Sequence, residues 1–108
     1  MNSSSLEEGK KYLKNIPGKI TVILEDATKG VNKGIKTIKY ISKDLKLPQF
    51  ISQFQKQLKL TSEDALFFLA KGKNALVGNQ TFQEIYDKFK DKDGFLYITY
   101  VRELVWGN

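Results

Sequence analysis

The sequence predicts an α+β fold of two layers, in which one long helix packs across a four-stranded mixed sheet. Two observations lead to this prediction. Four stretches of strand length carry β-branched or alternating apolar residues, and one longer stretch carries apolar residues at spacings of three and four. A chain of 108 residues with 41% hydrophobic residues is large enough to form one such domain without disulfides or metals.

The N-terminal part is expected to form a short helix ahead of the sheet. Residues 1–5 are a polar leader that we expect to be disordered. Residues 6–16 follow as a short N-terminal helix, with Ser5 as a candidate N-cap and two glutamates in the first turn. Pro17 ends this helix, and the domain itself is predicted to span residues 17–104.

The first two strands are predicted to form an antiparallel hairpin. Residues 19–26 form a β-branched run, and residues 35–41 alternate so that one face of the strand is polar. The connection between them contains glycines and an asparagine. Because it is too short for a crossover, the two strands must be antiparallel.

A change of period marks the long helix. Apolar residues recur at spacings of three and four over residues 47–60, with Pro48 allowed in the first turn and Asp44 as a possible cap. Residues 65–70 are a continuous apolar run, which predicts a strand buried on both faces. The loop that follows contains a possible short edge strand at residues 75–77.

The last two elements are a second helix and the final strand. Thr81 is the predicted N-cap of a helix whose apolar stripe is Phe82, Ile85, Tyr86 and Phe89. A turn ending at Gly94 starts the final strand, where alternation places Phe95, Tyr97 and Thr99 on one face and Leu96, Ile98 and Tyr100 on the other. The order helix, β, β, α, β, short α, β is that of the ubiquitin-like β-grasp.

The composition excludes several classes of chemistry. The chain has no cysteine and no histidine, which removes thiol nucleophiles, the usual zinc ligands and Ser-His-Asp triads. Asp91 and Asp93 flank a turn, the ordinary place for aspartates, so no catalytic residue, metal or cofactor is predicted. The absence of cysteine fits a reducing compartment, and the chain has neither a signal-peptide core nor an apolar run of about 18 residues. We therefore expect a cytoplasmic protein.

The net charge of +6 comes mostly from lysine. Seventeen lysines and one arginine stand against twelve acidic residues. Lysine on exposed faces is mainly a solubility device, and a nucleic-acid reader more often uses arginine for bidentate base contacts. Binding to nucleic acid is therefore not expected, whereas attraction to anionic lipid or to an acidic peptide stays open.

Four stretches carry a resemblance to a known family. They are Glu8-Gly9 with residues 17–25, residues 39–50, residues 62–68, and residues 90–107. Over roughly residues 7–107, the chain resembles the autophagy ubiquitin-like modifiers of the autophagy-related protein 8 family, closest to its GABARAP branch. It departs from the family in a shorter loop at Ser42-Lys43, in Thr21 and Gln53, and in the Trp106-Gly107 ending, which is more typical of the sister modifier, autophagy-related protein 12.

The resemblance implies that the C-terminus is a conjugation site. Residues 105–108 would be a flexible tail, a cysteine protease would cleave before Asn108, and Gly107 would become the acyl donor. Activating and conjugating enzymes would then deliver this glycine to phosphatidylethanolamine on autophagosomal or related vesicle membranes. A residue without Cβ suits the narrow channels of such enzymes. The chain would be a substrate and not an enzyme.

The resemblance also implies a dock for aromatic-x-x-aliphatic peptide motifs of receptors, which would add a strand to the open edge of the second strand. An aromatic pocket would be lined by Glu8, Tyr12, Ile23, Lys39, Ile41 and Phe95. An aliphatic pocket would be lined by Tyr40, Leu45 and Phe50, and Lys19 would meet acidic residues beside the motif. Core packing is an equally good interpretation of Ile23 and Phe50. Ser42 and Gln53 predict a more polar second pocket than the family's.

The main prediction is a lipid-conjugated modifier that is monomeric before conjugation. Two alternatives to it stay open. A modifier similar to autophagy-related protein 12 would be joined, covalently or not, to a protein acceptor. A basic adaptor would bind membrane or nucleic acid without conjugation, with steep salt dependence and no need for Gly107.

Overall fold

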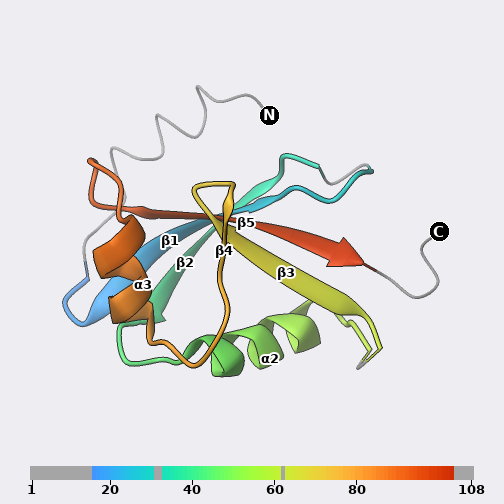
Figure 1. The fold of residues 1–108 in the computed structure, drawn as a ribbon, viewed down its shortest axis with the longest axis horizontal. Helices are drawn as coiled ribbons and strands as arrows, with labels where there is room; N and C mark the ends of the chain where they lie inside the picture. The colour runs from blue at the N-terminus through green and yellow to red at the C-terminus, as the bar shows by residue number, and fades with distance from the viewer. Residues whose placement is uncertain (1–15, 31–32, 62, 104–108) are drawn as a thin grey trace.

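The computed structural model describes residues 16–30, 33–61 and 63–103. Figure 1 shows their order along the chain: β1 (Lys19–Asp26), β2 (Lys36–Ser42), α2 (Leu47–Gln57), β3 (Ala65–Ala70), β4 (Asn74–Ala75), α3 (Phe82–Phe89) and β5 (Leu96–Glu103). The predicted leader, the N-terminal helix up to residue 15 and the C-terminal tail lie outside the described residues. For the rest, the predicted order of elements is confirmed.

The strands form one mixed sheet in the order β2-β1-β5-β3-β4. β1 pairs antiparallel with β2 and parallel with β5, and β3 pairs antiparallel with β5. The sheet has five strands, not the four predicted, because the two-residue β4 pairs with the end of β3. The predicted α+β class and ubiquitin-like arrangement are confirmed, and β2 is an edge strand.

The core lies between one face of the sheet and both described helices. Alternate residues of β1, namely Ile20, Val22 and Leu24, belong to the same buried cluster as Phe50 of α2 and Phe82 of α3. The ring centroids of Phe50 and Phe82 are 5.1 Å apart, in an edge-to-face arrangement that adds to the stabilisation from burial. Because Ile41 of β2 belongs to the same buried cluster, the cluster also fixes the position of α2 relative to the edge strand β2.

The ends of α2 differ from the prediction. Its N-cap is Lys46 instead of Asp44, and the Gln49 side chain accepts a hydrogen bond from the Lys46 N–H at 3.2 Å. The helix ends at Gln57, not at residue 60, because Lys59 adopts a left-handed backbone with φ of 59°. The N–H groups of Lys59 and Leu60 then bond back to the carbonyls of the last turn, which is the Schellman type of helix end.

β3 is not buried on both faces, as its continuous apolar sequence predicted. Phe68 is buried in the core, but its neighbour Phe67 is 51% exposed. Successive side chains of a strand point to opposite faces, and the core occupies only the face that carries Phe68. The unbroken apolar run therefore predicted the strand correctly, but the prediction that its second face is buried was wrong.

The predicted N-cap of α3 is confirmed. The Thr81 Oγ1 accepts a hydrogen bond from the Glu84 N–H at 3.2 Å, and the Glu84 carboxylate accepts one from the Thr81 N–H at 2.9 Å. This reciprocal pair satisfies two donors at the start of the helix. The bond from the Thr81 N–H, followed by the bond from its hydroxyl, lowers the pKa of Glu84 below its ordinary value of 4.5.

Thr81→Ala is expected to lower the free energy of unfolding by about 1 kcal/mol near neutral pH, and Thr81→Ser to leave it nearly unchanged. Because the pKa of Glu84 is lower in the folded state, the stabilisation from its charge is present above the unfolded pKa and is lost as the pH falls through the folded value. The difference in the free energy of unfolding between wild type and Thr81→Ala should therefore become smaller below roughly pH 4. Urea denaturation at several pH values measures this, and a difference that stays constant in acid would contradict it.

Candidate functional site

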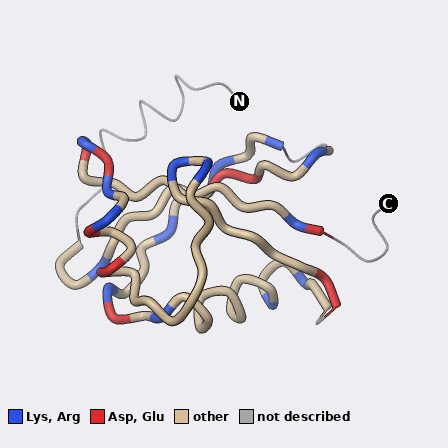
Figure 2. Tube along the Cα trace, viewed as in Figure 1, with Lys and Arg blue, Asp and Glu red and all other residues tan. Residues whose placement is uncertain are grey.

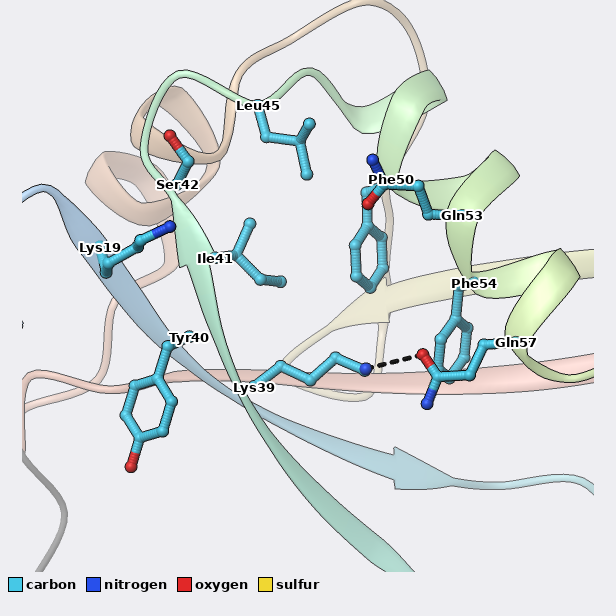
Figure 3. Close-up of a pocket in the computed structure, with 10 residues that line it drawn as sticks. All are labelled: Lys19, Lys39, Tyr40, Ile41, Ser42, Leu45, Phe50, Gln53, Phe54 and Gln57. Atoms are coloured by element: carbon cyan, nitrogen blue, oxygen red, sulfur yellow. Dashed lines mark hydrogen bonds between the residues drawn. The ribbon is translucent and has the colours of Figure 1, made fainter.

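A groove of about 430 Å³ runs between the edge strand β2 and helix α2 (Figure 3). Because the phenylalanines of α2 are anchored in the core, the helix stays at a fixed distance from β2 and the groove is part of the fold. Its lining residues are Lys19, Lys39, Tyr40, Ile41, Ser42, Leu45, Phe50, Gln53, Phe54 and Gln57.

One end of the groove is apolar and the other is polar. Ile41, Leu45 and Phe50 lie together at the apolar end (Figure 3). At the polar end, the Lys39 ammonium donates a hydrogen bond to the Gln57 side-chain oxygen at 2.7 Å, and the same nitrogen lies 5.6 Å from the centre of the Phe54 ring. The groove can therefore accept one aliphatic side chain and, beside it, a polar or anionic group that interacts with the Lys39 ammonium.

Within the described part of the chain, no strand pairs with the outer side of β2. The Asp26 N–H bonds to the Ile35 carbonyl and the Lys43 N–H to the Gly18 carbonyl, so the odd-numbered residues from 35 to 43 direct their backbone groups toward β1. Backbone groups alternate along a strand, and those of Lys36, Ile38 and Tyr40 therefore face the open edge, whereas the Ser42 carbonyl accepts a hydrogen bond from the Leu45 N–H at 3.1 Å. An extended peptide can pair with them as an additional strand.

The opposite face of the same edge is also apolar. Ile23 lies opposite Ile38 across the β1–β2 pair and is only 2% exposed, although it lies outside the main core cluster. Phe95 is likewise buried outside that cluster. The Tyr40 ring points away from α2 (Figure 3). Apolar side chains therefore flank the β2 edge on both faces of the sheet.

The structure brings together most, but not all, of the predicted docking residues. The groove is lined by Lys19, Lys39, Tyr40, Ile41, Leu45 and Phe50, and also by the polar residues Ser42 and Gln53. Ile23 and Phe95 do not line it. Glu8 and Tyr12, like Gly107 and Asn108, lie outside the described residues.

The sheet register separates some of the residues predicted for the aromatic pocket. Lys39 and Ile41 were expected beside Ile23, but the sheet register pairs them with Val22 and Ile20, whose side chains lie on the α2 face. They therefore share the groove with Leu45 and Phe50. Sequence reasoning also missed Gln57 and Phe54: the apolar stripe of α2 contained Phe54, but nothing in the sequence indicated that Gln57 would reach Lys39.

The charges of the described residues are dispersed. Figure 2 shows lysines at both ends of the sheet and in loops on several sides of the molecule, interspersed with acidic residues. Within the described ranges, no group of three or more acidic residues is placed to hold a metal ion. None of the described helices has the length and hydrophobicity that a membrane crossing requires.

Comparisons with known proteins agree with this architecture. The model of the family described as "Autophagy protein Atg8 ubiquitin like" matches residues 4–107. Autophagy-related protein 8e of Arabidopsis thaliana is 35% identical over 101 residues, which cover 93% of this chain and 82% of the relative. Autophagy-related protein 8c of the same plant is 36% identical over 102 residues, covering 93% and 84%.

The fold comparison gives the same relationship. The crystal structure of Trypanosoma brucei ATG8 superposes with a TM-score of 0.68 and 28% identity, covering 97% of this chain and 90% of that one. The match of the family model spans nearly the whole chain, including the edge strand and the groove described above. The chain is therefore a member of the Atg8 family of ubiquitin-like autophagy proteins.

Proposed function

We propose that this protein is a ubiquitin-like modifier that is trimmed after Gly107, conjugated to phosphatidylethanolamine on autophagosomal membranes, and used there to dock receptor peptides with an aromatic-x-x-aliphatic motif. The observation that carries the docking part is the groove beside the open β2 edge. Family membership supports the conjugation part. In this proposal the chain is a substrate of the protease and of the conjugating enzymes, and catalyses nothing itself.

The spacing of the motif fits the two faces of the β2 edge. In an extended peptide, residues three positions apart point to opposite faces. An aliphatic residue placed beside Ile41 enters the apolar end of the groove, and the aromatic residue three positions away then lies on the opposite face. On that face lies the half-buried Ile38, which is opposite the buried Ile23. A single added strand therefore reaches both apolar sites.

This spacing also favours a parallel orientation of the peptide. With the aliphatic residue beside Ile41, a peptide parallel to β2 places its aromatic residue beside Ile38, which is half-buried. An antiparallel peptide would place the aromatic residue beside Asp44, which is exposed and polar and follows the end of β2. Burial of an aromatic ring is favourable only in the first case.

Substitutions of Tyr40 test strand addition. The Tyr40 N–H faces the open edge, so Tyr40→Pro removes a hydrogen-bond donor from the added strand while leaving the β1–β2 bonds intact. We expect Tyr40→Pro to bind an aromatic-x-x-aliphatic peptide about fivefold more weakly than Tyr40→Ala, which removes the ring and keeps the N–H. Isothermal titration with both variants measures this difference.

Lys39→Pro is the matched control, because its N–H faces β1 and its loss should destabilise the fold itself. Circular dichroism must show that Tyr40→Pro retains the wild-type fold. Equal affinities of Tyr40→Pro and Tyr40→Ala would show that the peptide does not pair with β2. Absence of binding to the wild-type chain would refute the docking function.

A further inference from the structure

We propose that Thr28 is a positioning residue for the reaction at the C-terminus, and that its hydroxyl holds the end of β5 in the place from which Gly107 is presented to the processing protease. This inference rests on the proposed conjugation function and adds to it a residue that lies far from Gly107 in the sequence. It gives a role to the loop after β1, which does not line the docking groove.

The last residues of β5 lie beside different neighbours on their two sides. Among the residues that the structure describes, β1 pairs with β5 only as far as Asp26 and Tyr100, whereas β3 pairs with β5 as far as Glu103. On the β1 side, the Ala27 N–H donates a hydrogen bond to the Tyr100 carbonyl at 2.8 Å, and β1 has already ended there. Past Tyr100, the backbone of β5 therefore lies beside the loop that follows β1.

Thr28 bonds to this part of β5 through its side chain. The Thr28 hydroxyl accepts a hydrogen bond from the Arg102 N–H at 2.8 Å, and so takes the place of the backbone carbonyl that a longer β1 would offer. The bond joins residues 74 apart in the sequence and is partly buried, so loss of the acceptor leaves a backbone donor without its partner. Unlike the backbone bonds between β1 and β5, this bond can be removed by substitution of one side chain.

Asp26 orients both partners of this bond. Its carboxylate is buried; one oxygen accepts a hydrogen bond from the Thr28 N–H at 2.8 Å, and the other accepts one from the Arg102 guanidinium at 3.2 Å. A bond from an aspartate side chain to the N–H two residues later sets the direction of the turn. We call Asp26, Thr28 and Arg102 the strand-end clamp, because Asp26 orients Thr28 and Thr28 holds the backbone of Arg102.

The strand-end clamp lies close to the proposed reactive residue. Gly107 follows Arg102 by five residues, which span at most about 18 Å when fully extended. A protease that binds the folded domain can reach Gly107 only when the chain leaves β5 in a suitable direction. Holding the end of the strand in place lowers the entropy that is lost when the glycine enters the active site. We therefore expect the clamp to change the rate of the bound complex more than its affinity.

Trimming of the full chain by an extract of the native cell tests the proposal. Mass spectrometry follows the loss of Asn108 at several concentrations of the purified chain, which separates the maximal rate from the apparent KM. Thr28→Val keeps the shape of the side chain and removes the acceptor. We expect it to lower the maximal rate about fivefold, the factor that corresponds to one hydrogen bond, with little change in KM. Thr28→Ser keeps the hydroxyl and should retain the wild-type rate.

Two further measurements separate positioning from stability. Thr81→Ala is the matched control, because it also removes a hydroxyl that accepts a backbone N–H, but at the start of α3. It should destabilise the domain to a similar degree in urea and leave the maximal rate of trimming unchanged. Hydrogen exchange of the Arg102 amide should be faster in Thr28→Val than in Thr28→Ser, because only serine keeps the acceptor.

The outcomes separate the inference from the proposed function. If Thr28→Val is trimmed like the wild type or changes only KM, or if Thr81→Ala is slowed as much, the inference is wrong while trimming stands. A slow Thr28→Ser, or an Arg102 amide that exchanges equally in both variants, would also overturn it. If the wild-type chain keeps Asn108, the proposed conjugation fails, and the inference fails with it.

Discussion

Replacing Gly107 with alanine is expected to abolish both the removal of Asn108 and the phosphatidylethanolamine adduct in the native cell. Glycine has no Cβ, so it passes in an extended conformation through the narrow channels of a processing protease and an activating enzyme. Alanine adds a methyl group to residue 107, whose carboxyl carbon would be the acyl group. Each enzyme must approach this residue most closely. We therefore expect a loss below detection and not a modest decrease in rate.

The short connection to the domain strengthens this expectation. β5 ends at Glu103, and the four residues that follow it up to Gly107 span at most roughly 14 Å when fully extended. The folded domain must therefore come close to the enzymes that handle Gly107. A bulky substitution at this residue cannot be relieved by moving the reactive end further from the domain.

Mass spectrometry of the C-terminus measures both effects in one experiment. Asn108→Ala is the matched control, because it changes the leaving residue and keeps Gly107, and we expect it to be trimmed and conjugated like the wild type. An adduct to a protein in place of the lipid would favour a modifier similar to autophagy-related protein 12, as the Trp106-Gly107 ending also does. An intact Asn108 with no adduct would refute conjugation.

The sequence predicted the elements of this fold because each is specified locally. The period of two in β5 predicted its two faces, and the structure shows that the face with Leu96, Ile98 and Tyr100 is the buried one. Thr81 and Glu84 fixed the start of α3 through bonds within one turn of the chain. The start of α2 is equally local, because Gln49 bonds back to Lys46 three residues earlier. The polar residues around Asp44, however, did not distinguish Lys46 as the N-cap.

The arrangement of the site was harder to predict because it depends on contacts between distant residues. A shift of one residue in strand register moves every side chain of β2 to the other face of the sheet. The sequence KYI at residues 39–41 was expected to place Lys39 with Ile23, whereas the register places it on the α2 face. The Lys39–Gln57 bond joins residues 18 apart, and only the packing of α2 brings them together.

The second large effect is expected at the end of β1 and β5. Asp26 is 2% exposed, and its carboxylate accepts hydrogen bonds from the Thr28 N–H at 2.8 Å and from the Arg102 guanidinium at 3.2 Å. The Thr28 hydroxyl in turn accepts a bond from the Arg102 N–H at 2.8 Å. Burial and the charge of Asp26 raise the pKa of the neighbouring Tyr100, so the folded state favours its neutral phenol.

Arg102→Met is expected to lower the free energy of unfolding by about 3 kcal/mol, because it leaves the buried Asp26 carboxylate without its counter-charge. Asp26→Ala should cost less, because the Arg102 side chain is 21% exposed and its guanidinium can reach water. The Arg102 Nε is already buried without a hydrogen-bond partner among the described residues, which makes the guanidinium dependent on Asp26. Urea denaturation measures both values. Glu25→Ala is the control, since its carboxylate is not buried, and it should change stability by less than about 0.5 kcal/mol.

The double variant Asp26→Ala with Arg102→Met separates the ion pair from the loss of each side chain. Once one charge has been removed, removing the other relieves an unpaired buried charge, so the double variant should be less destabilised than the sum of the single variants. Strictly additive effects would show that the two side chains act independently. Because the pair lies near the end of β5, five residues before Gly107, its loss should also loosen the strand that precedes the proposed conjugation site.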